Sequence, residues 1–347
     1  MAGNKSITII GGGLAGLTLG LGLRQCGVAV TLHEAGHYPR HRVCGEFISG
    51  RGQLTLARLG LRALLDQAGA VPAQTTAFYS ATQATTPRSL PSPALCLSRF
   101  RLDAALAKQF RDHGGELRED QRAPLADLGE GLVRATGRRA EAEPGGARWF
   151  GLKVHARNVS LTADLEMHVS PRGYVGLCRL DDGEVNVCGL FRKKANDHDG
   201  NKNSRELLRG QPGSALRERL ADAVFDDDSF CSVAGLSLSP RQAVTRAEIS
   251  VGDAITMIPP VTGNGMSMAF ESAELAVAPL AAWSRGEASW GEVRRQIAQS
   301  CDAAFARRLV WAKWLQRLIL APALQTPLVV LAARCDGFRQ LAFDRTR

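Results

Sequence analysis

The fold is decided by residues 7–34, which read ITIIGGGLAGLTLGLGLRQCGVAVTLHE. The β-branched run at 7–10 is typical of a short buried strand, and 28–33 predicts a second strand. The apolar run at 14–26 between them predicts a helix. The turn out of the first strand carries glycines with the spacing G-x-G-x-x-G, and this order of elements is typical of a dinucleotide-binding unit.

The glycines and the start of the helix suit a pyrophosphate. Gly11 permits the tight turn, Gly13 has no side chain to block the backbone, and Gly16 lets the helix lie close to the sheet. The unpaired N–H groups of the first turn, which includes Leu14 and Ala15, offer hydrogen bonds and a positive dipole end to phosphates. The alternative is a glycine-rich turn in an ordinary α/β unit.

Glu34 stands at the end of the second predicted strand, roughly 20 residues past the glycines, as the dinucleotide fingerprint requires. Its carboxylate can accept hydrogen bonds from both hydroxyls of an adenosine ribose, and its charge would repel a 2′-phosphate. The stretch therefore favours FAD or NAD over NADP. An ordinary α/β unit leaves Glu34 unexplained.

The bulk composition indicates a globular protein. The 347 residues suit two intimate domains, and the 45% hydrophobic and 22% charged content is ordinary for that class. The chain enters its first strand almost at once, so we expect no signal peptide and a cytoplasmic protein. The eight cysteines are scattered without a C-x-x-C pair, which predicts reduced thiols and no metal site. The net charge of +9 is spread without a basic–aromatic stripe, so we expect no nucleic-acid partner.

The middle of the chain changes towards a period of two residues. Strand-like runs between 148 and 192, with the hairpin turn Asp181-Asp182-Gly183, predict a second, antiparallel sheet that covers a ligand. The expected fold class is α/β: a Rossmann-type FAD-binding domain with an inserted antiparallel β-sheet substrate domain and C-terminal helices. The predicted boundaries are 1–70, 98–146 and 245–285 for the FAD-binding domain, 71–97 and 147–244 for the sheet domain, and 286–347 for the helical segment.

The sequence also predicts individual elements within these domains. We expect single helices over 51–68 and 204–223, and a strand over 243–251. The helical segment is expected to break near Pro322 and Pro327. The segments expected to be polar connections are 138–146 and 197–203.

A second constellation lies at residues 252–266. A predicted strand ends in Gly252-Asp253, a Pro-Pro loop follows, and Gly263-Asn264-Gly265-Met266 stands at a helix start. An aspartate at a strand end can hold a ribityl hydroxyl, and the N–H groups of a glycine-rich helix start can face the N1–C2=O edge of a flavin. The alternative is a turn and a helix cap. Together with the N-terminal fingerprint, the constellation favours FAD.

With these residues the chain resembles the FAD-dependent oxidoreductases of the para-hydroxybenzoate hydroxylase fold. Within that fold it is most similar to the branch of geranylgeranyl reductases and flavin-dependent halogenase-like proteins. The resemblance covers residues 5–285. It is carried by Gly11–Gly16 with Glu34, Arg42–Glu46, Ser98-Arg99 with Asp103, Ala135–Gly137, and Gly252-Asp253 with Pro259–Met266.

The resemblance implies roles for individual residues. Arg42 and Arg99 would contact the FAD, and Asp253 would hold its ribityl-pyrophosphate region. The isoalloxazine edge would meet Gly263, Asn264, Gly265 and Met266.

The middle motif departs from the family pattern. Gly137 closes this FAD- and NAD(P)H-linked motif, which reads Ala-Thr-Gly here and Ala-Asp-Gly in many members. The sequence therefore leaves open whether NADH or NADPH reduces the flavin directly. The sequence lacks Trp-x-Trp-x-Ile-Pro, which argues against halogenation. It also lacks the aromatic lipid-binding signature of the prenyl reductases.

Two residues of the glycine-flanked loop at 42–46 are candidates for chemistry. Cys44 is expected close to the flavin, where its thiol could donate a proton or could simply pack as a small apolar group. Glu46 could act as an acid or base if burial raises its pKa, or could form an ion pair with Arg42 or Arg51.

The C-terminal helices combine tryptophans with cations. Trp311 and Trp314 lie among Arg307, Arg308, Lys313 and Arg317. This pattern fits a helix that packs on the core. It also fits a helix that closes an oily tunnel or rests on a membrane surface.

The sequence supports three functions. The first is a flavin monooxygenase that hydroxylates a hydrophobic aromatic or polyketide-type natural product, either free or bound to a carrier. The second is a flavin-dependent reductase or dehydrogenase of C–C bonds in a prenyl or acyl lipid. The third is a prenyl-binding protein of the same fold without enzymatic activity, which the intact glycines and Glu34 disfavour.

Overall fold

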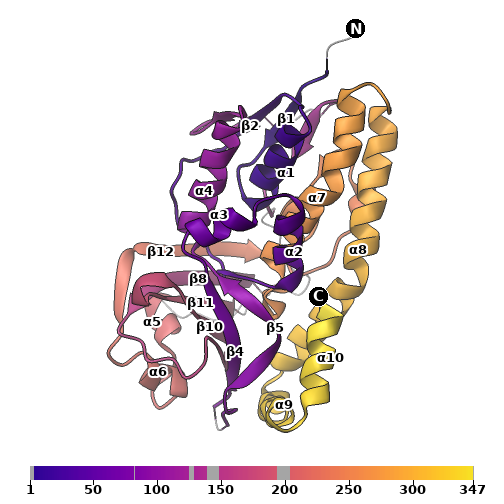
Figure 1. The fold of residues 1–347 in the computed structure, drawn as a ribbon. Coiled ribbons are helices and arrows are strands. Elements are labelled where there is room, and N and C mark those ends of the chain that lie inside the picture. The colour runs from indigo at the N-terminus through magenta and orange to yellow at the C-terminus, as the bar shows by residue number, and fades with distance from the viewer. Residues whose placement is uncertain (1–3, 82, 125–128, 139–147, 194–203, 347) are drawn as a thin grey trace.

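The computed structural model describes residues 4–81, 83–124, 129–138, 148–193 and 204–346. Two sheets, the helices that connect and follow their strands, and a group of C-terminal helices make up this part of the chain (Figure 1). The predicted connection at 197–203, all of the one at 138–146 except Arg138, and the domain boundary at 146–147 lie outside the described residues.

The first sheet is the parallel one that residues 7–34 predict. Its strand order is β13-β7-β1-β2-β6, and every pair is parallel. The helix α1 (Leu14–Gln25) connects β1 to β2 and packs against α7 (Gly265–Ser284) and α4 (Arg99–Asp112). The strands are β1 (Ile7–Ile10), β2 (Val30–His33), β6 (Glu116–Arg118), β7 (Leu132–Arg134) and β13 (Ile249–Ser250).

The second sheet is mixed, whereas the sequence predicted an antiparallel one. Its order is β12-β8-β11-β10-β9-β4-β5-β3, and β4 runs parallel to β9 with Thr76 opposite Leu165. This parallel pair arises because the chain leaves the sheet after β5 and returns to it much later. The strands are β3 (Phe47–Ile48), β4 (Val71–Tyr79), β5 (Arg88–Cys96), β8 (Arg148–Arg157), β9 (Leu165–Ser170), β10 (Gly173–Arg179), β11 (Val185–Lys193) and β12 (Val224–Leu236).

The predicted hairpin is confirmed, but two predicted helices are divided. β10 and β11 pair antiparallel across the short 3-10 turn Asp181–Gly183. The predicted helix over 51–68 is two helices, α2 (Gly50–Arg58) and α3 (Arg62–Gln67), because Gly60 takes a left-handed φ of 69° between them.

The second predicted helix is also divided by glycines with positive φ. The predicted helix over 204–223 is divided into α5 (Ser204–Arg209) and α6 (Ala215–Arg219). Gly210 and Gly213 between them also have positive φ, and such backbone cannot continue a right-handed helix.

The predicted strand over 243–251 is wrong for most of its length. Ala243–Thr245 forms a 3-10 turn, and only Ile249–Ser250 pairs with the sheet. The carboxylate of Asp302 accepts the N–H groups of Ala243 and Val244 at 2.6 and 3.1 Å. Those N–H groups are therefore bonded to a side chain rather than to a neighbouring strand.

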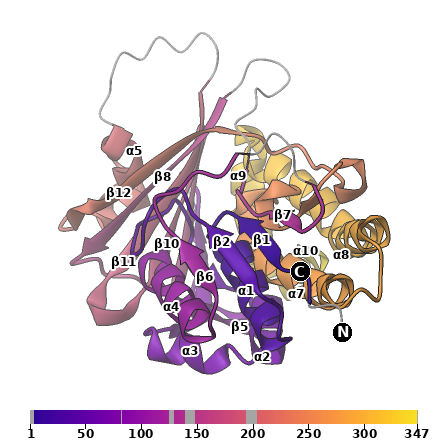
Figure 2. The ribbon, with the colours of Figure 1, turned by 90° about the horizontal axis from the view of Figure 1, so that it is seen from above.

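The C-terminal helices run along the first sheet's helices and then turn towards the second sheet. They are α8 (Trp290–Ile319), α9 (Pro322–Arg334) and α10 (Asp336–Thr346), and they lie on the side of the molecule away from α5 (Figure 2). The break at Pro322 is confirmed, whereas that at Pro327 is wrong because α9 continues through it. Among the described helices none is long and apolar enough to span a membrane alone; only α8 and α9 together, bent by 109°, have the required length and composition.

Candidate active site

The glycine turn before α1 leaves an open cradle. Gly11 has a φ of 112°, and a Cβ there would lie 2.3 Å from the carbonyl oxygen of Ala135, so only glycine fits. A Cβ on Gly16 would lie 1.9 Å from the carbonyl oxygen of Gly11. By contrast, a Cβ on Gly13 would meet nothing within 4 Å, and no side chain caps the helix there. The N–H groups at Leu14 and the residues beside it therefore border free space, which fits a pyrophosphate.

Glu34 lies beside this cradle, where the fingerprint predicts a ribose-binding acid. Its carboxylate accepts the N–H of Gly12 at 2.8 Å and that of Gly36 at 3.1 Å. Arg40 pairs with the same carboxylate, and Arg42 approaches it at 3.4 Å. The sequence reasoning missed Arg40, whose only signal was a cation six residues after the acid.

Arg42 and Arg99 form one buried network with Asp103. Arg99 donates to both carboxylate oxygens of Asp103, at 2.7 and 2.8 Å, and the Nε of Arg42 lies 3.3 Å from the same carboxylate. Asp103 is fully buried. Because Arg42 also approaches Glu34, the network connects the cradle to the loop at 42–46.

The second constellation lies at the end of β13, as predicted. Asp253 is in the 3-10 turn Gly252–Ala254, and burial raises its pKa to about 6 although Arg138 and Arg99 favour the ionised form. Gly137 lies just before Arg138 and has a φ of 73°. Asp253 and Arg138 both line one cavity. With a pKa of about 6 the carboxyl is mostly ionised at neutral pH, so it can accept hydrogen bonds from sugar hydroxyls.

The start of α7 contributes backbone rather than side chains. The Asn264 side chain is fully buried, accepts from the Ser49 hydroxyl at 3.0 Å and donates to the carbonyl of Thr346. The Met266 side chain packs in the main core. Gly263 lines the cavity, and a Cβ on Gly265 would meet nothing within 4 Å. Of the four residues that the resemblance assigned to the isoalloxazine edge, Asn264 and Met266 therefore have only their backbone available.

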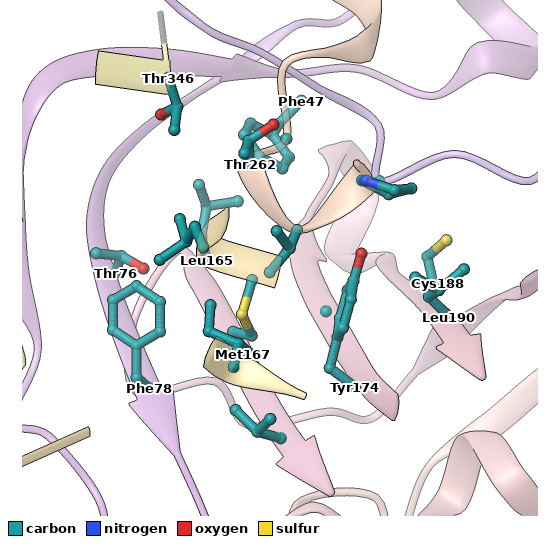
Figure 3. A pocket seen from close by; sticks show the side chains of 18 of the residues that line it. Phe47, Thr76, Phe78, Leu165, Met167, Tyr174, Cys188, Leu190, Thr262 and Thr346 are labelled. Carbon is teal, nitrogen blue, oxygen red and sulfur yellow. The ribbon is translucent and has the colours of Figure 1, made fainter. Parts of the chain in front are cut away.

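The cavity has a volume of about 360 Å³ and lies between the second sheet, the loop at 43–47 and helices α8–α10 (Figure 3). Its lining is mainly apolar. Cys44, Asp253 and Gly263, which are far apart in the sequence, all reach it. The sequence reasoning missed most of the wall, including Phe47, Phe78, Met167, Leu190, Leu236, Val261, Val329 and Phe343.

Cys44 and Glu46 lie on opposite sides of their loop. Cys44 lines the cavity, and burial raises the pKa of its thiol, so the thiol stays protonated near neutral pH. Glu46 is fully buried with a φ of 59° and does not line the cavity. A buried non-glycine residue in left-handed backbone is held there by its surroundings.

Charged partners explain where Glu46 is held. Its carboxylate lies 2.7 Å from His155 Nε2 and 3.6 Å from the Lys153 ammonium, and it accepts the N–H of Arg99 at 2.9 Å. Burial alone would raise the pKa of Glu46, but these partners hold it below its usual value. The predicted partners Arg42 and Arg51 are therefore wrong: the partners come from β8, which the sequence could not place opposite this loop.

His41, which is partly buried, adjoins this group. Its Nδ1 lies 2.9 Å from the Lys153 ammonium, and burial together with Lys153 lowers the pKa of His41 to about 4. Neutral His41 can thus accept a hydrogen bond from Lys153. Across the described residues, no cluster of three or more histidine, cysteine or acidic side chains is arranged to hold a metal.

Comparisons with known proteins match the chain by structure. No family model matches the sequence, and no curated protein matches it. The flavin-dependent brominase Bmp2 superimposes with a TM-score of 0.69 at 16% identity, covering 98% of this chain and 97% of that one. The halogenase PltM gives 0.71 at 15%, covering 97% and 85%. PqsL of Pseudomonas aeruginosa, in complex with 2-aminobenzoylacetate, gives 0.70 at 15%, covering 92% and 97%. The chain therefore has the fold of these flavin enzymes, as its sequence predicted.

Proposed function

We propose that the chain is an FAD-dependent monooxygenase that hydroxylates a hydrophobic aromatic or polyketide-type molecule. The observation that carries the proposal is that Cys44 and Asp253 line the same cavity. It is apolar enough for such a substrate and adjoins the predicted far end of the flavin site. The shared fold with PqsL, which is described as a probable FAD-dependent monooxygenase, supports the same reaction class.

The described residues fit FAD at both ends. The free space at Gly13 accommodates the pyrophosphate, Glu34 binds the adenosine ribose, and Asp253 binds the ribityl chain. Gly265 offers its backbone to the pyrimidine edge of the ring. When bound and reduced, FAD supplies the two electrons that split dioxygen into a substrate hydroxyl and water.

The chain's own residues position the reaction and exclude water. The apolar walls of the cavity keep solvent from the reacting atoms. Glu46 acts as a positioning residue, because it fixes the loop whose other side presents Cys44. Cys44 is the candidate proton donor, since its thiol is protonated and faces the cavity. NADH or NADPH is the proposed reductant.

The test combines the purified holoprotein with NADH or NADPH, ¹⁸O₂ and a panel of neutral aromatic compounds. We expect consumption of the nicotinamide to depend on oxygen and the product to gain one ¹⁸O atom. A C–C bond reductase would convert its substrate equally well without oxygen. Colourless protein that remains colourless after incubation with FAD would instead support the binding-protein alternative.

We propose a second role for the outer face of the C-terminal helices, as a peripheral contact with an anionic membrane. Val310, Trp314 and Leu331 are exposed there, and no acidic residue occurs between Ala303 and Cys335. Exposed apolar groups among cations suit such a surface. This makes the proposed location cytoplasmic with membrane association.

Vesicle sedimentation tests the membrane proposal. The protein should sediment with vesicles that contain phosphatidylglycerol more than with pure phosphatidylcholine, and Trp314→Ser should weaken this. An acidic carrier protein that presents the substrate is the alternative partner. Equal sedimentation with both kinds of vesicle would overturn the membrane contact.

A further inference from the structure

The deeply buried polar groups that line the cavity differ in how their hydrogen bonds are met. Thr262 donates to the carbonyl of Pro259 at 3.1 Å, and Thr346 donates to that of Ala342 at 2.7 Å. Glu166 is bonded to His168 and Thr162. All three side chains are therefore satisfied by the protein itself.

Tyr174 is the exception among the deeply buried polar residues that line the described cavity. It belongs to β10 at the middle of the second sheet, and only 6% of its surface is exposed. It belongs to one buried apolar cluster with Leu190, Leu236 and Val261. Its hydroxyl points into the cavity, towards the side where Phe47 and Thr262 lie (Figure 3), and has no hydrogen-bond partner among the described residues.

Because the hydroxyl faces the cavity and has no protein partner among the described residues, its hydrogen-bonding capacity is available to a molecule in the cavity. Burial also raises the pKa of Tyr174 well above its usual value, so the phenol stays neutral and can donate its proton in a hydrogen bond. A ligand oxygen in the cavity would satisfy that donor. The nearby Leu190 and Leu236 would disfavour an ionised group at the same place.

We propose that the hydroxyl of Tyr174 is the anchor by which the cavity orients its ligand. The ligand class it selects is an uncharged, largely apolar molecule that presents one carbonyl or hydroxyl oxygen to this phenol. The proposal rests on the proposed function, because it deepens the substrate class of the same cavity. It makes Tyr174 a specificity-determining residue.

Two probes of nearly equal shape test this selection. 2-Acetylnaphthalene carries a carbonyl oxygen, and 2-isopropenylnaphthalene replaces that oxygen with a methylene group. Their dissociation constants are measured by calorimetry on the FAD-loaded protein. We expect the wild type to bind the ketone about tenfold more tightly than the hydrocarbon, as one hydrogen bond allows.

Tyr174→Phe should remove this preference by weakening ketone binding about tenfold while leaving hydrocarbon binding unchanged. The matched control is Tyr79→Phe, since the Tyr79 hydroxyl is bonded to Thr162 at 2.6 Å and the residue does not line the cavity. It should keep the wild-type preference.

The proposal is overturned if the wild type does not prefer the ketone or if Tyr174→Phe keeps the preference. Neither outcome requires catalytic turnover, because both are measured as dissociation constants. A protein that binds the ketone through Tyr174 but incorporates no ¹⁸O into any product would contradict the proposed monooxygenase and leave the anchor standing.

Discussion

The glycine cradle and the apolar cavity are built in opposite ways. The cradle is made of backbone: Gly11, Gly13 and Gly16 act through the side chains they lack, within a few residues of sequence. The cavity is made of side chains from both ends of the chain, such as Phe47 and Phe343. A site made of backbone tolerates few substitutions, whereas one made of side chains can be retuned residue by residue. Single substitutions in the cradle should therefore abolish cofactor binding, whereas single substitutions in the cavity wall should change ligand affinity by smaller amounts.

The largest effect is expected at Gly13. Gly13→Val places a side chain in the free space that we assign to the pyrophosphate, and the residue's φ of −79° lets valine adopt the backbone without strain. The purified variant should be folded and lack flavin. Gly291→Val is the matched control, because it also adds a side chain to open space in the first turn of a helix. If Gly13→Val purifies with the flavin content of the control, the cradle is wrongly assigned.

A large effect on stability is expected at Glu46, where the loop between the two sites is held. Glu46→Gln removes a buried charge facing Lys153 and His155, so the free energy of unfolding at pH 7 should fall by about 3 kcal/mol. Glu184→Gln, at a more exposed partner of His155, should cost less than 1 kcal/mol, about the value of a surface pair. Urea unfolding measures both.

The pH dependence of that loss follows from the lowered pKa of Glu46. The folded state then holds its carboxylate ionised more firmly than the unfolded state, whose pKa is near 4.5. The stabilisation is complete above that value and is lost as pH falls through the folded pKa. The difference between wild type and Glu46→Gln should therefore shrink on acidification below about pH 4. A difference that grows on acidification would contradict the assignment.

A smaller effect on FAD affinity is expected at Asp253, which lines the cavity. Asp253→Ala should weaken FAD binding about 10- to 100-fold, the value of a hydrogen bond to a charged group. Asp253→Asn keeps an acceptor and should lose less. Fluorescence titration of the apoprotein with FAD measures both. Equal affinities in the wild type and both variants would mean that Asp253 does not contact the cofactor.

The smallest effect is expected at the helices that close the cavity. Gln325 in α9 donates to the carbonyl of Ser170 at 2.9 Å and so ties the helix to the second sheet. Gln325→Ala should weaken binding of 2-acetylnaphthalene about fivefold, the value of one ordinary hydrogen bond, and leave FAD affinity unchanged. An equal loss of FAD affinity would show that the two sites are not separable.

The same contrast explains what the sequence could reveal. The placement of Gly13 at the helix start with Glu34 beside it was predictable because a local spacing determines it. The placement of Asp253 was predictable because it follows a strand and precedes a glycine-rich helix start. The parallel strand pair of the second sheet and the cavity wall at Met167 and Leu190 could not be predicted, because they depend on which strands pair. The prediction of the partners of Glu46 was wrong for the same reason. Lys153 is more than a hundred residues away in the sequence, and only the second sheet brings it to the loop.

The central claim is that the ring of FAD bound at the cradle lies against the cavity. The most direct test is to titrate the FAD-loaded protein with 2-acetylnaphthalene and record the visible spectrum of the flavin. The claim predicts a difference spectrum that saturates with the dissociation constant found by calorimetry. Calorimetric binding of the ketone with an unchanged flavin spectrum would contradict it.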